Sequence, residues 1–369
     1  MGFLATNGLV INGEDEQRAL LLDGVAVHRP RSHARKKGIK RSMTIWTFTN
    51  GIGRYDCNSV DEFLQVLAPS DPNWGWQPRL RRTSWVFRGH SDSSWPLLPN
   101  AWRDPPAASI QRAHALVLPR VPPLTGVTQW DHTGTLPAPP VIDLTAARQV
   151  IIQANVELLL LAEFLHRIDE LGIDILGGLP PTIHQAGVFE VLRPVAADDF
   201  LQLQGLEEQS GLAQHYGVPT RLLDWSDDGL TAAYFAASSP SGADRLCVWA
   251  LNEELSVSQV QPLWGNVALT LKVIRPPRST NSYLRAQRGA FTAPWGAGCY
   301  ALMNNGTYPT IEGFVSAIHH LTGPGDILRC ITLPRTLANQ LLEALQRHWI
   351  TADTLMPSAT TVAGSILGP

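Results

Sequence analysis

Residues 214–225 concentrate side chains that can bind and polarise a ligand. The segment carries an amide, an imidazole, a phenol, a hydroxyl, a guanidinium, a carboxylate and an indole, from Gln214, His215, Tyr216, Thr220, Arg221, Asp224 and Trp225. Structural interpretations exist for single residues: His215 as a helix cap, Tyr216 and Trp225 as core aromatics, and Arg221 paired with Asp224. A segment that only joins a helix to a strand rarely needs so many hydrogen-bonding groups. The pattern therefore predicts a binding site.

Arg88 is a second candidate, because it ends an apolar segment at 84–88 that is typical of a β-strand. A guanidinium offers a planar fork of donors that matches a phosphate or a carboxylate. Gly89 follows it, and a residue without a side chain lets a ligand or another backbone approach closely. The structural alternative is an arginine paired with a carboxylate of the core.

Several common catalytic patterns are absent from the sequence. It contains no GxxxxGK[ST], GxGxxG, GxSxG or HExxH pattern, and His319-His320 has no acidic or cysteine partner nearby in the sequence. Triphosphate-binding loops, α/β-hydrolases and zinc proteases of the usual types therefore lack support. We predict no metal site.

Three segments together resemble the FRG domain family. Phe87-Arg88-Gly89 comes first, then residues 214–217 with 219–225, and finally residues 285–291, which contain Gln287 and Phe291. The similarity extends over about residues 44–360, and Leu355-Met356-Pro357 is similar to the end of the family. The resemblance identifies a family without specifying an activity.

A strand that ends in aromatic-Arg-Gly is also similar to the first motif of arginine-type ADP-ribosyltransferases, which use NAD. This resemblance implies that Arg88 holds the phosphates and that Tyr216, Trp225 or Phe291 fixes the nicotinamide. Those enzymes carry a late [Gln/Glu]-x-Glu motif, whose nearest match here is Gln287-Arg288-Gly289, with glycine in place of the glutamate. Asp224 is then the best candidate for the missing carboxylate, and Glu207 and Glu208 are the next candidates.

Three hypotheses follow from these residues. The first is an NAD-dependent ADP-ribosyltransferase-like enzyme with an unknown macromolecular acceptor. The second is a module that binds a small nucleotide without turnover, as a sensor or effector in microbial conflict, and the third is a structural polar network with a partner surface at 103–147. For the first we predict catalytic residues Asp224, Arg88 and Gln287, and NAD-binding residues Arg88, Gly89, Gln214, His215, Tyr216, Thr220, Arg221, Trp225 and Phe291.

The elements that must position these residues indicate an α+β fold with a mixed, mainly antiparallel sheet and flanking helices. We consider the ADP-ribosyltransferase fold as one such arrangement. Strands are predicted at 44–49, 84–88, 245–252, 267–274 and 326–333, with an extended segment at 220–225. Helices are predicted at 58–67, 147–171, 197–215, 228–238, 311–321 and 335–348, and Gly172 fits a helix C-terminus. Between 274 and 311 we expect loops.

Composition shifts divide the chain into segments. Residues 1–42 form a basic segment that we expect to be a mobile extension, and Met43 is a candidate start. Residues 43–360 form the FRG domain, with an irregular Pro-rich insertion at 103–147, and 361–369 a frayed tail.

The charge and cysteine distributions restrict the partners and the compartment. Of the 29 Lys and Arg residues and 32 Asp and Glu residues, eight and four precede position 43, which leaves a net charge of -7 on the remainder. Such a body argues against general nucleic-acid binding. The four cysteines are far apart, and we find no signal peptide and no apolar run long enough for a membrane span. We therefore expect a cytoplasmic protein with reduced, buried thiols.

Overall fold

The protein is represented by a computed structural model, which describes residues 46–124, 143–175, 178–179, 183, 206–254, 261–264, 267–279, 281–322 and 326–367. The chain separates into two units, Met1–Met43 and Thr44–Pro369. This division lies one residue from the predicted boundary. The predicted mobile extension at 1–42 lies outside the described residues, so the fold below is that of the second unit.

The fold is α+β, as predicted, and is built on a mixed sheet. Eight strands follow the order β1-β2-β11-β7-β5-β6-β10-β9, and β8 adds to the edge at β9. Among the described pairs, only β2 and β11 run parallel. The strands are β1 Thr47–Thr49, β2 Ile52–Asp56, β5 Trp85–His90, β6 Leu223–Ser226, β7 Arg245–Asn252, β8 Gln261–Trp264, β9 Val267–Ile274, β10 Gly289–Trp295 and β11 Leu328–Pro334. A separate pair consists of β3 Trp76–Gln77 and β4 Arg82–Thr83.

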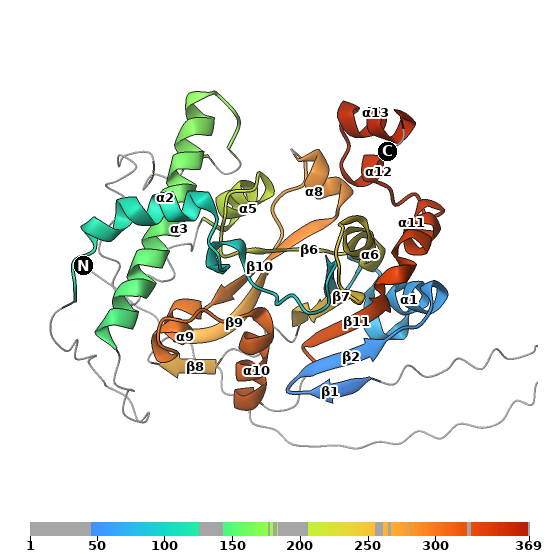
Figure 1. Cartoon of the computed structure of the whole chain (residues 1–369), viewed down its shortest axis with the longest axis horizontal. Coiled ribbons are helices and arrows are strands. Elements are labelled where there is room, and N and C mark those ends of the chain that lie inside the picture. The colour runs from blue at the N-terminus through green and yellow to red at the C-terminus, as the bar shows by residue number, and fades with distance from the viewer. Residues whose placement is uncertain are drawn as a thin grey trace, which may run out of the picture. The chain divides into compact units, whose positions relative to one another are not determined.

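Helices cover both faces of this sheet (Figure 1). On one face, α1 Val60–Leu67, α6 Gly229–Ser238 and α11 Ala338–Gln346 share a core with strand residues such as Phe87. On the other, α10 Ile311–Thr322 packs on a core that contains Val86. Neighbouring residues of β5 thus serve opposite faces, as the two-residue period of a strand requires.

A group of helices packs beside the sheet. It comprises α2 Ala108–Val117, α3 Leu144–Glu170, α5 Glu207–His215 and α9 Ala297–Met303. The helix predicted at 147–171 is confirmed as α3. Gly172 has φ +67° and the N–H of Ile173 donates to the carbonyl oxygen of Ile168 at 2.9 Å, which is a glycine-terminated helix end.

Helix α3 is long and apolar enough to cross a membrane by length and composition alone. However, 61% of its most apolar window is buried inside the structure. A core helix of a folded domain passes the same test, so this feature is weak evidence for a span.

Several sequence predictions need correction. The region 103–147 is not uniformly irregular, because α2 and the start of α3 lie in its described part. The expected loops between 274 and 311 contain α8 Ser282–Ala286, β10 and α9. The expected tail after residue 360 is helical, because α13 spans Ala359–Leu367 after the short α12 Ala352–Leu355. Of the helix predicted at 197–215, residues 197–205 lie outside the described residues, and the remainder contains α5. Short 3-10 turns occur at Pro72–Trp74, Asn100–Trp102, Leu118–Arg120 and Arg335–Leu337.

Candidate functional site

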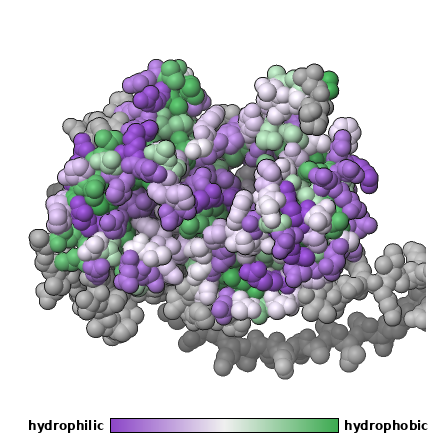
Figure 2. Space-filling model, viewed as in Figure 1, coloured by the Kyte–Doolittle hydropathy of each residue, from purple (hydrophilic) through white to green (hydrophobic). Residues whose placement is uncertain are grey.

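A cavity of about 990 Å³ opens where β5 and β6 meet. These two strands are joined by a single residue pair, Phe87 with Ser226, whereas every residue of β5 pairs with a residue of β7. The volume lies at the upper end of the usual range for ligand pockets, about 300–1000 Å³. Figure 2 shows the surface hollowed between the regions where α8 and α6 lie in Figure 1, with mainly hydrophilic residues around it.

Arg88 lies at the centre of this cavity. Its Nη1 donates to the carbonyl oxygen of Asp224 at 2.8 Å and lies 3.5 Å from Asp224 Oδ2, so the side chain spans the gap between the two strands. Burial lowers the pKa of Arg88, while the charge of Asp224 opposes that change. A guanidinium stays protonated at neutral pH nonetheless. With 16% of its side chain exposed, it is partly accessible rather than sealed in the interior.

His90 is a neutral neighbour of this arginine. Burial first, and then the charge of Arg88, lower the pKa of His90 to about 3. Arg88 Nε donates to His90 Nε2 at 3.0 Å, so Nδ1 carries the proton. His90 is not among the predicted site residues, although its position two residues after Arg88 places both side chains on one face of β5.

Asp224 provides the carboxylate of the site. Its side chain is 54% exposed, and Gln214 Nε2 on α5 lies 3.4 Å from its Oδ2. Because the Asp224 carboxylate is largely solvated and lies 3.5 Å from Arg88 Nη1, we expect this ion pair to contribute little energy. Arg88, Asp224 and Gln287, the three predicted catalytic residues, all line this cavity.

Gln287 forms hydrogen bonds within the cavity wall. Its side-chain Nε2 donates to the backbone carbonyl oxygen of Leu355 at 3.2 Å, and its backbone carbonyl oxygen accepts from Ser226 Oγ at 2.7 Å. It thereby joins the C-terminal segment, which adds Met356 to the lining, to the end of β6. The amide predicted to be catalytic is therefore already bonded to the backbone.

Two other predicted ligand residues, Thr220 and Arg221, do not line the cavity. Arg221 is buried, and its Nε donates to Glu157 Oε2 on α3 at 2.7 Å. The proposed alternative pairing of Arg221 with Asp224 is therefore wrong, because the carboxylate partner comes from a helix distant in sequence. Thr220 contacts Gln214 instead.

The predicted aromatic residues lie at different depths. Trp225 and Phe291 are buried and contribute only part of the cavity floor, and Trp225 Nε1 donates to Thr292 Oγ1 at 2.9 Å. Tyr216 is exposed at the rim, and its ring centroid is 5.3 Å from that of His215. Gly89 lines the wall, but its missing side chain serves helix packing, because an added Cβ would lie 2.0 Å from the Ala232 carbonyl oxygen of α6.

The cavity is also lined by residues that were not predicted from the sequence. These residues include His90, Ser91, Trp95, Arg103, Phe235, Tyr283 and Met356. Arg103 adds a second cation, and partial loss of hydration, followed by the charge of Arg88, lowers its pKa. Apart from His90 and Met356, these residues belong to no periodic or motif pattern in the sequence, and only tertiary structure brings them together. Within the part of the chain that the structure describes, no three His, Cys, Asp or Glu side chains gather to hold a metal ion.

His215 reports on the charge of Asp224. Burial lowers the pKa of His215, and the Asp224 carboxylate partly restores it. We therefore expect Asp224→Asn to lower the pKa of His215 further, as measured by an NMR pH titration of the imidazole. The control Glu163→Gln should leave this pKa unchanged because Glu163 pairs with Arg112 elsewhere. An unchanged His215 pKa in Asp224→Asn would contradict the arrangement.

Comparison with known proteins identifies one domain. The sequence model of the FRG domain family matches residues 196–245, a segment that holds α5, β6 and α6 and therefore Gln214 and Asp224. The chain contains an FRG domain. No curated protein and no solved structure matches the chain, so the ADP-ribosyltransferase-like form of the fold is not confirmed.

Proposed function

We propose that the FRG domain binds a nucleotide of the NAD class in this cavity and transfers ADP-ribose from NAD to an acceptor. The observation that carries the proposal is that Arg88 and Asp224, from neighbouring strands, line the same large cavity. A cation for phosphate and a carboxylate for a developing positive charge are the two charged groups that such a reaction needs.

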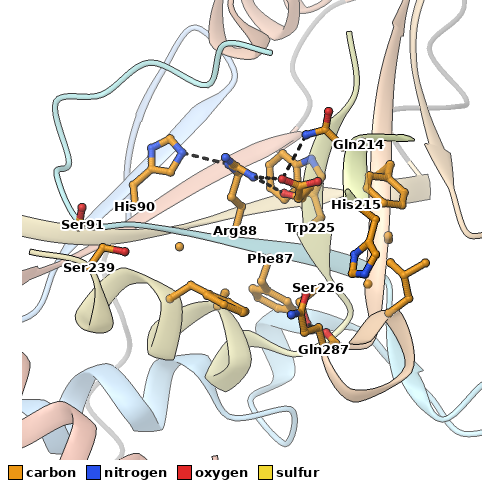
Figure 3. A pocket seen from close by; sticks show the side chains of 18 of the residues that line it. Phe87, Arg88, His90, Ser91, Gln214, His215, Trp225, Ser226, Ser239 and Gln287 are labelled. Atoms are coloured by element: carbon orange, nitrogen blue, oxygen red, sulfur yellow. Dashed lines mark hydrogen bonds and ion pairs between the residues drawn. The ribbon is translucent and has the colours of Figure 1, made fainter. Parts of the chain in front are cut away.

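The shape of the site suits a ligand with a charged centre and a ring at each end. Figure 3 shows Arg88 between His90 on one side and His215 and Gln287 on the other. Trp95 lines the His90 end, and Tyr283 lies beside His215, with ring centroids 5.6 Å apart. A pyrophosphate at Arg88, with Arg103 as a second cation, would leave both aromatic groups for the rings of a dinucleotide.

Asp224 would act at the bond that breaks. The bond between ribose C1′ and the nicotinamide nitrogen breaks, and its electron pair leaves with nicotinamide. The carboxylate stabilises the ribosyl cation electrostatically. A nucleophilic oxygen or nitrogen of the acceptor then bonds to C1′ and loses its proton to solvent.

Position 289 favours a second candidate, nucleotide binding without turnover. A Cβ built at Gly289 would lie 2.7 Å from Cδ2 of Leu284, so a glutamate could enter only by displacing that side chain. Asp224 alone would then supply the charge, and its contact with Arg88 partly offsets that charge. In this case the domain is a sensor or effector module.

The test measures NAD binding by calorimetry and nicotinamide release by chromatography on the purified chain. Arg88→Ala should weaken NAD binding about 10- to 100-fold, because a hydrogen bond to a charged group contributes about 1.5–3 kcal/mol. Asp224→Asn should retain binding and lose nicotinamide release. The control Arg112→Ala removes an exposed cation paired with Glu163 and should change neither quantity.

The possible outcomes separate the candidates. Binding without release by the wild-type chain contradicts transfer and supports the second candidate. If the wild-type chain binds no NAD and Arg88→Ala unfolds at a much lower temperature, both candidates fail and Arg88 is structural. The partner surface would then be sought in the described part of 103–147.

A further inference from the structure

Thr220 occupies a position from which it can act on the cavity without lining it. The residue is buried, and its Oγ1 accepts from the N–H of Leu222 at 3.1 Å and contacts Gln214 Oε1 at 2.7 Å. A hydroxyl has one proton to donate. Since the amide oxygen of Gln214 can only accept, that proton is directed to Gln214.

This hydrogen bond fixes the orientation of the Gln214 amide. With Oε1 held by Thr220, Nε2 is left on the opposite side, where it lies 3.4 Å from Asp224 Oδ2. The oxygen and nitrogen of a side-chain amide are assigned from their partners, and here the two partners agree. A reversed amide would bring Oε1 against the carboxylate and repel it.

As a consequence, the two oxygens of the Asp224 carboxylate have different surroundings. Asp224 Oδ2 faces both Gln214 Nε2 and Arg88 Nη1, at 3.4 and 3.5 Å. Within the described residues, Asp224 Oδ1 has no hydrogen-bond or ion-pair partner, and the side chain lines the cavity. An ionised carboxylate only accepts hydrogen bonds, so this oxygen requires a donor from the ligand or from water.

We infer that Thr220 is a positioning residue, which acts through Gln214 to hold Asp224 with one oxygen available to a hydroxyl of a sugar-bearing ligand. The inference rests on the proposed function for the identity of the ligand, and on the hydrogen bonds alone for the positioning. A bare phosphate or pyrophosphate is not a preferred ligand for this oxygen, because it presents no sugar hydroxyl and its negative charge repels the carboxylate.

The ligand test compares ADP-ribose with inorganic pyrophosphate by calorimetry. Thr220→Val keeps the shape and removes the hydroxyl, and should weaken ADP-ribose binding about 3- to 10-fold, as expected for loss of one well-placed hydrogen bond. Pyrophosphate binding should stay unchanged. Thr220→Ser restores the hydroxyl and should bind ADP-ribose as the wild type does. Equal losses for both ligands in Thr220→Val, or no loss for either, would overturn the ligand assignment.

A second measurement tests the positioning without any ligand. The negative charge of Asp224 raises the pKa of His215, so moving the carboxylate away should lower that pKa. We expect this decrease in Thr220→Val and not in Thr220→Ser. In an Asp224→Asn background, Thr220→Val should have no further effect. Gln214→Ala, at the end of α5, provides the same test should Thr220→Val fail to fold.

The two failures are distinguishable. If the wild-type chain binds neither NAD nor ADP-ribose, the proposed function fails, while the His215 titrations still decide the positioning. If ADP-ribose binds but the pKa of His215 is identical in the wild type and Thr220→Val, the positioning role is wrong and the proposed function stands.

Discussion

Replacing Asp227 with alanine is expected to lower the free energy of unfolding by about 3–5 kcal/mol, the usual cost of breaking a buried ion pair. The Asp227 side chain is only 6% exposed. It accepts from Arg275 Nη2 at 2.8 Å and from Arg278 Nη2 at 2.7 Å. Alanine would remove the one buried carboxylate that both arginines share, at the point where β6, β9 and β10 are joined, and would leave Arg275 with Glu253 and Arg278 with backbone carbonyl oxygens.

The measurement is urea unfolding followed by far-UV circular dichroism. Glu163→Ala is the matched control, because the Glu163–Arg112 pair is more exposed and its loss should cost about 1 kcal/mol or less. Equal effects of the two substitutions would show that the Asp227 network does not stabilise the fold.

The effect of Asp227→Ala should also depend on pH. Burial alone would raise the pKa of Asp227, but hydrogen bonds and charge from Arg275 and Arg278 lower it below its usual value. The stabilisation is therefore complete above the unfolded-state pKa of about 3.9 and is lost as the pH falls through the lower folded-state pKa. The difference between wild type and variant should narrow in that acid range.

Gly89→Ala is expected to destabilise the domain by about 3 kcal/mol or more, at or above the upper end of ordinary overpacking. A Cβ at this position would lie 2.0 Å from the carbonyl oxygen of Ala232 and 2.7 Å from the nitrogen of Ala236. Both atoms belong to the backbone of α6, so no side-chain rotation can relieve the contact. The helix would have to move away from β5.

Gly242→Ala is the control for this substitution, because nothing lies within 4 Å of a Cβ built there. It should change the free energy of unfolding by less than about 0.5 kcal/mol. If Gly89→Ala were equally mild in urea unfolding, the glycine of the aromatic-Arg-Gly motif would serve the ligand and not the packing of α6. The structure favours packing.

The parts of the fold that sequence predicted well have strong local signals. Strand β7 has the predicted bounds, 245–252, and α6 begins after Asp228, whose side chain accepts from the N–H of Thr231. In contrast, β10 was missed because it begins at Gly289 and contains Pro294, and both residue types are rare inside strands. Its pairing with β6 and β9 comes from tertiary context.

The residues of the candidate site likewise fall into those with a local sequence signal and those without one. Arg88, Gln214 and Asp224 were identified because motif-like segments concentrate polar groups, and the structure brings them together. The partner of Arg221 was missed because Glu157 lies 64 residues away on a helix whose pattern reads as core. Sequence proximity favoured Asp224 instead. Long-range pairing of charges leaves no local signature.

The single Phe87–Ser226 pair between β5 and β6 leaves the two parts of the sheet joined mainly by side chains. The strands β1-β2-β11-β7-β5 lie on one side of this seam and β6-β10-β9-β8 on the other. One apolar core contains Val86 from the first part and Leu223 from the second, and the Arg88 guanidinium donates to the Asp224 carbonyl oxygen across the seam. A ligand held by both Arg88 and Asp224 would therefore add a further cross-link at the place where backbone pairing is weakest.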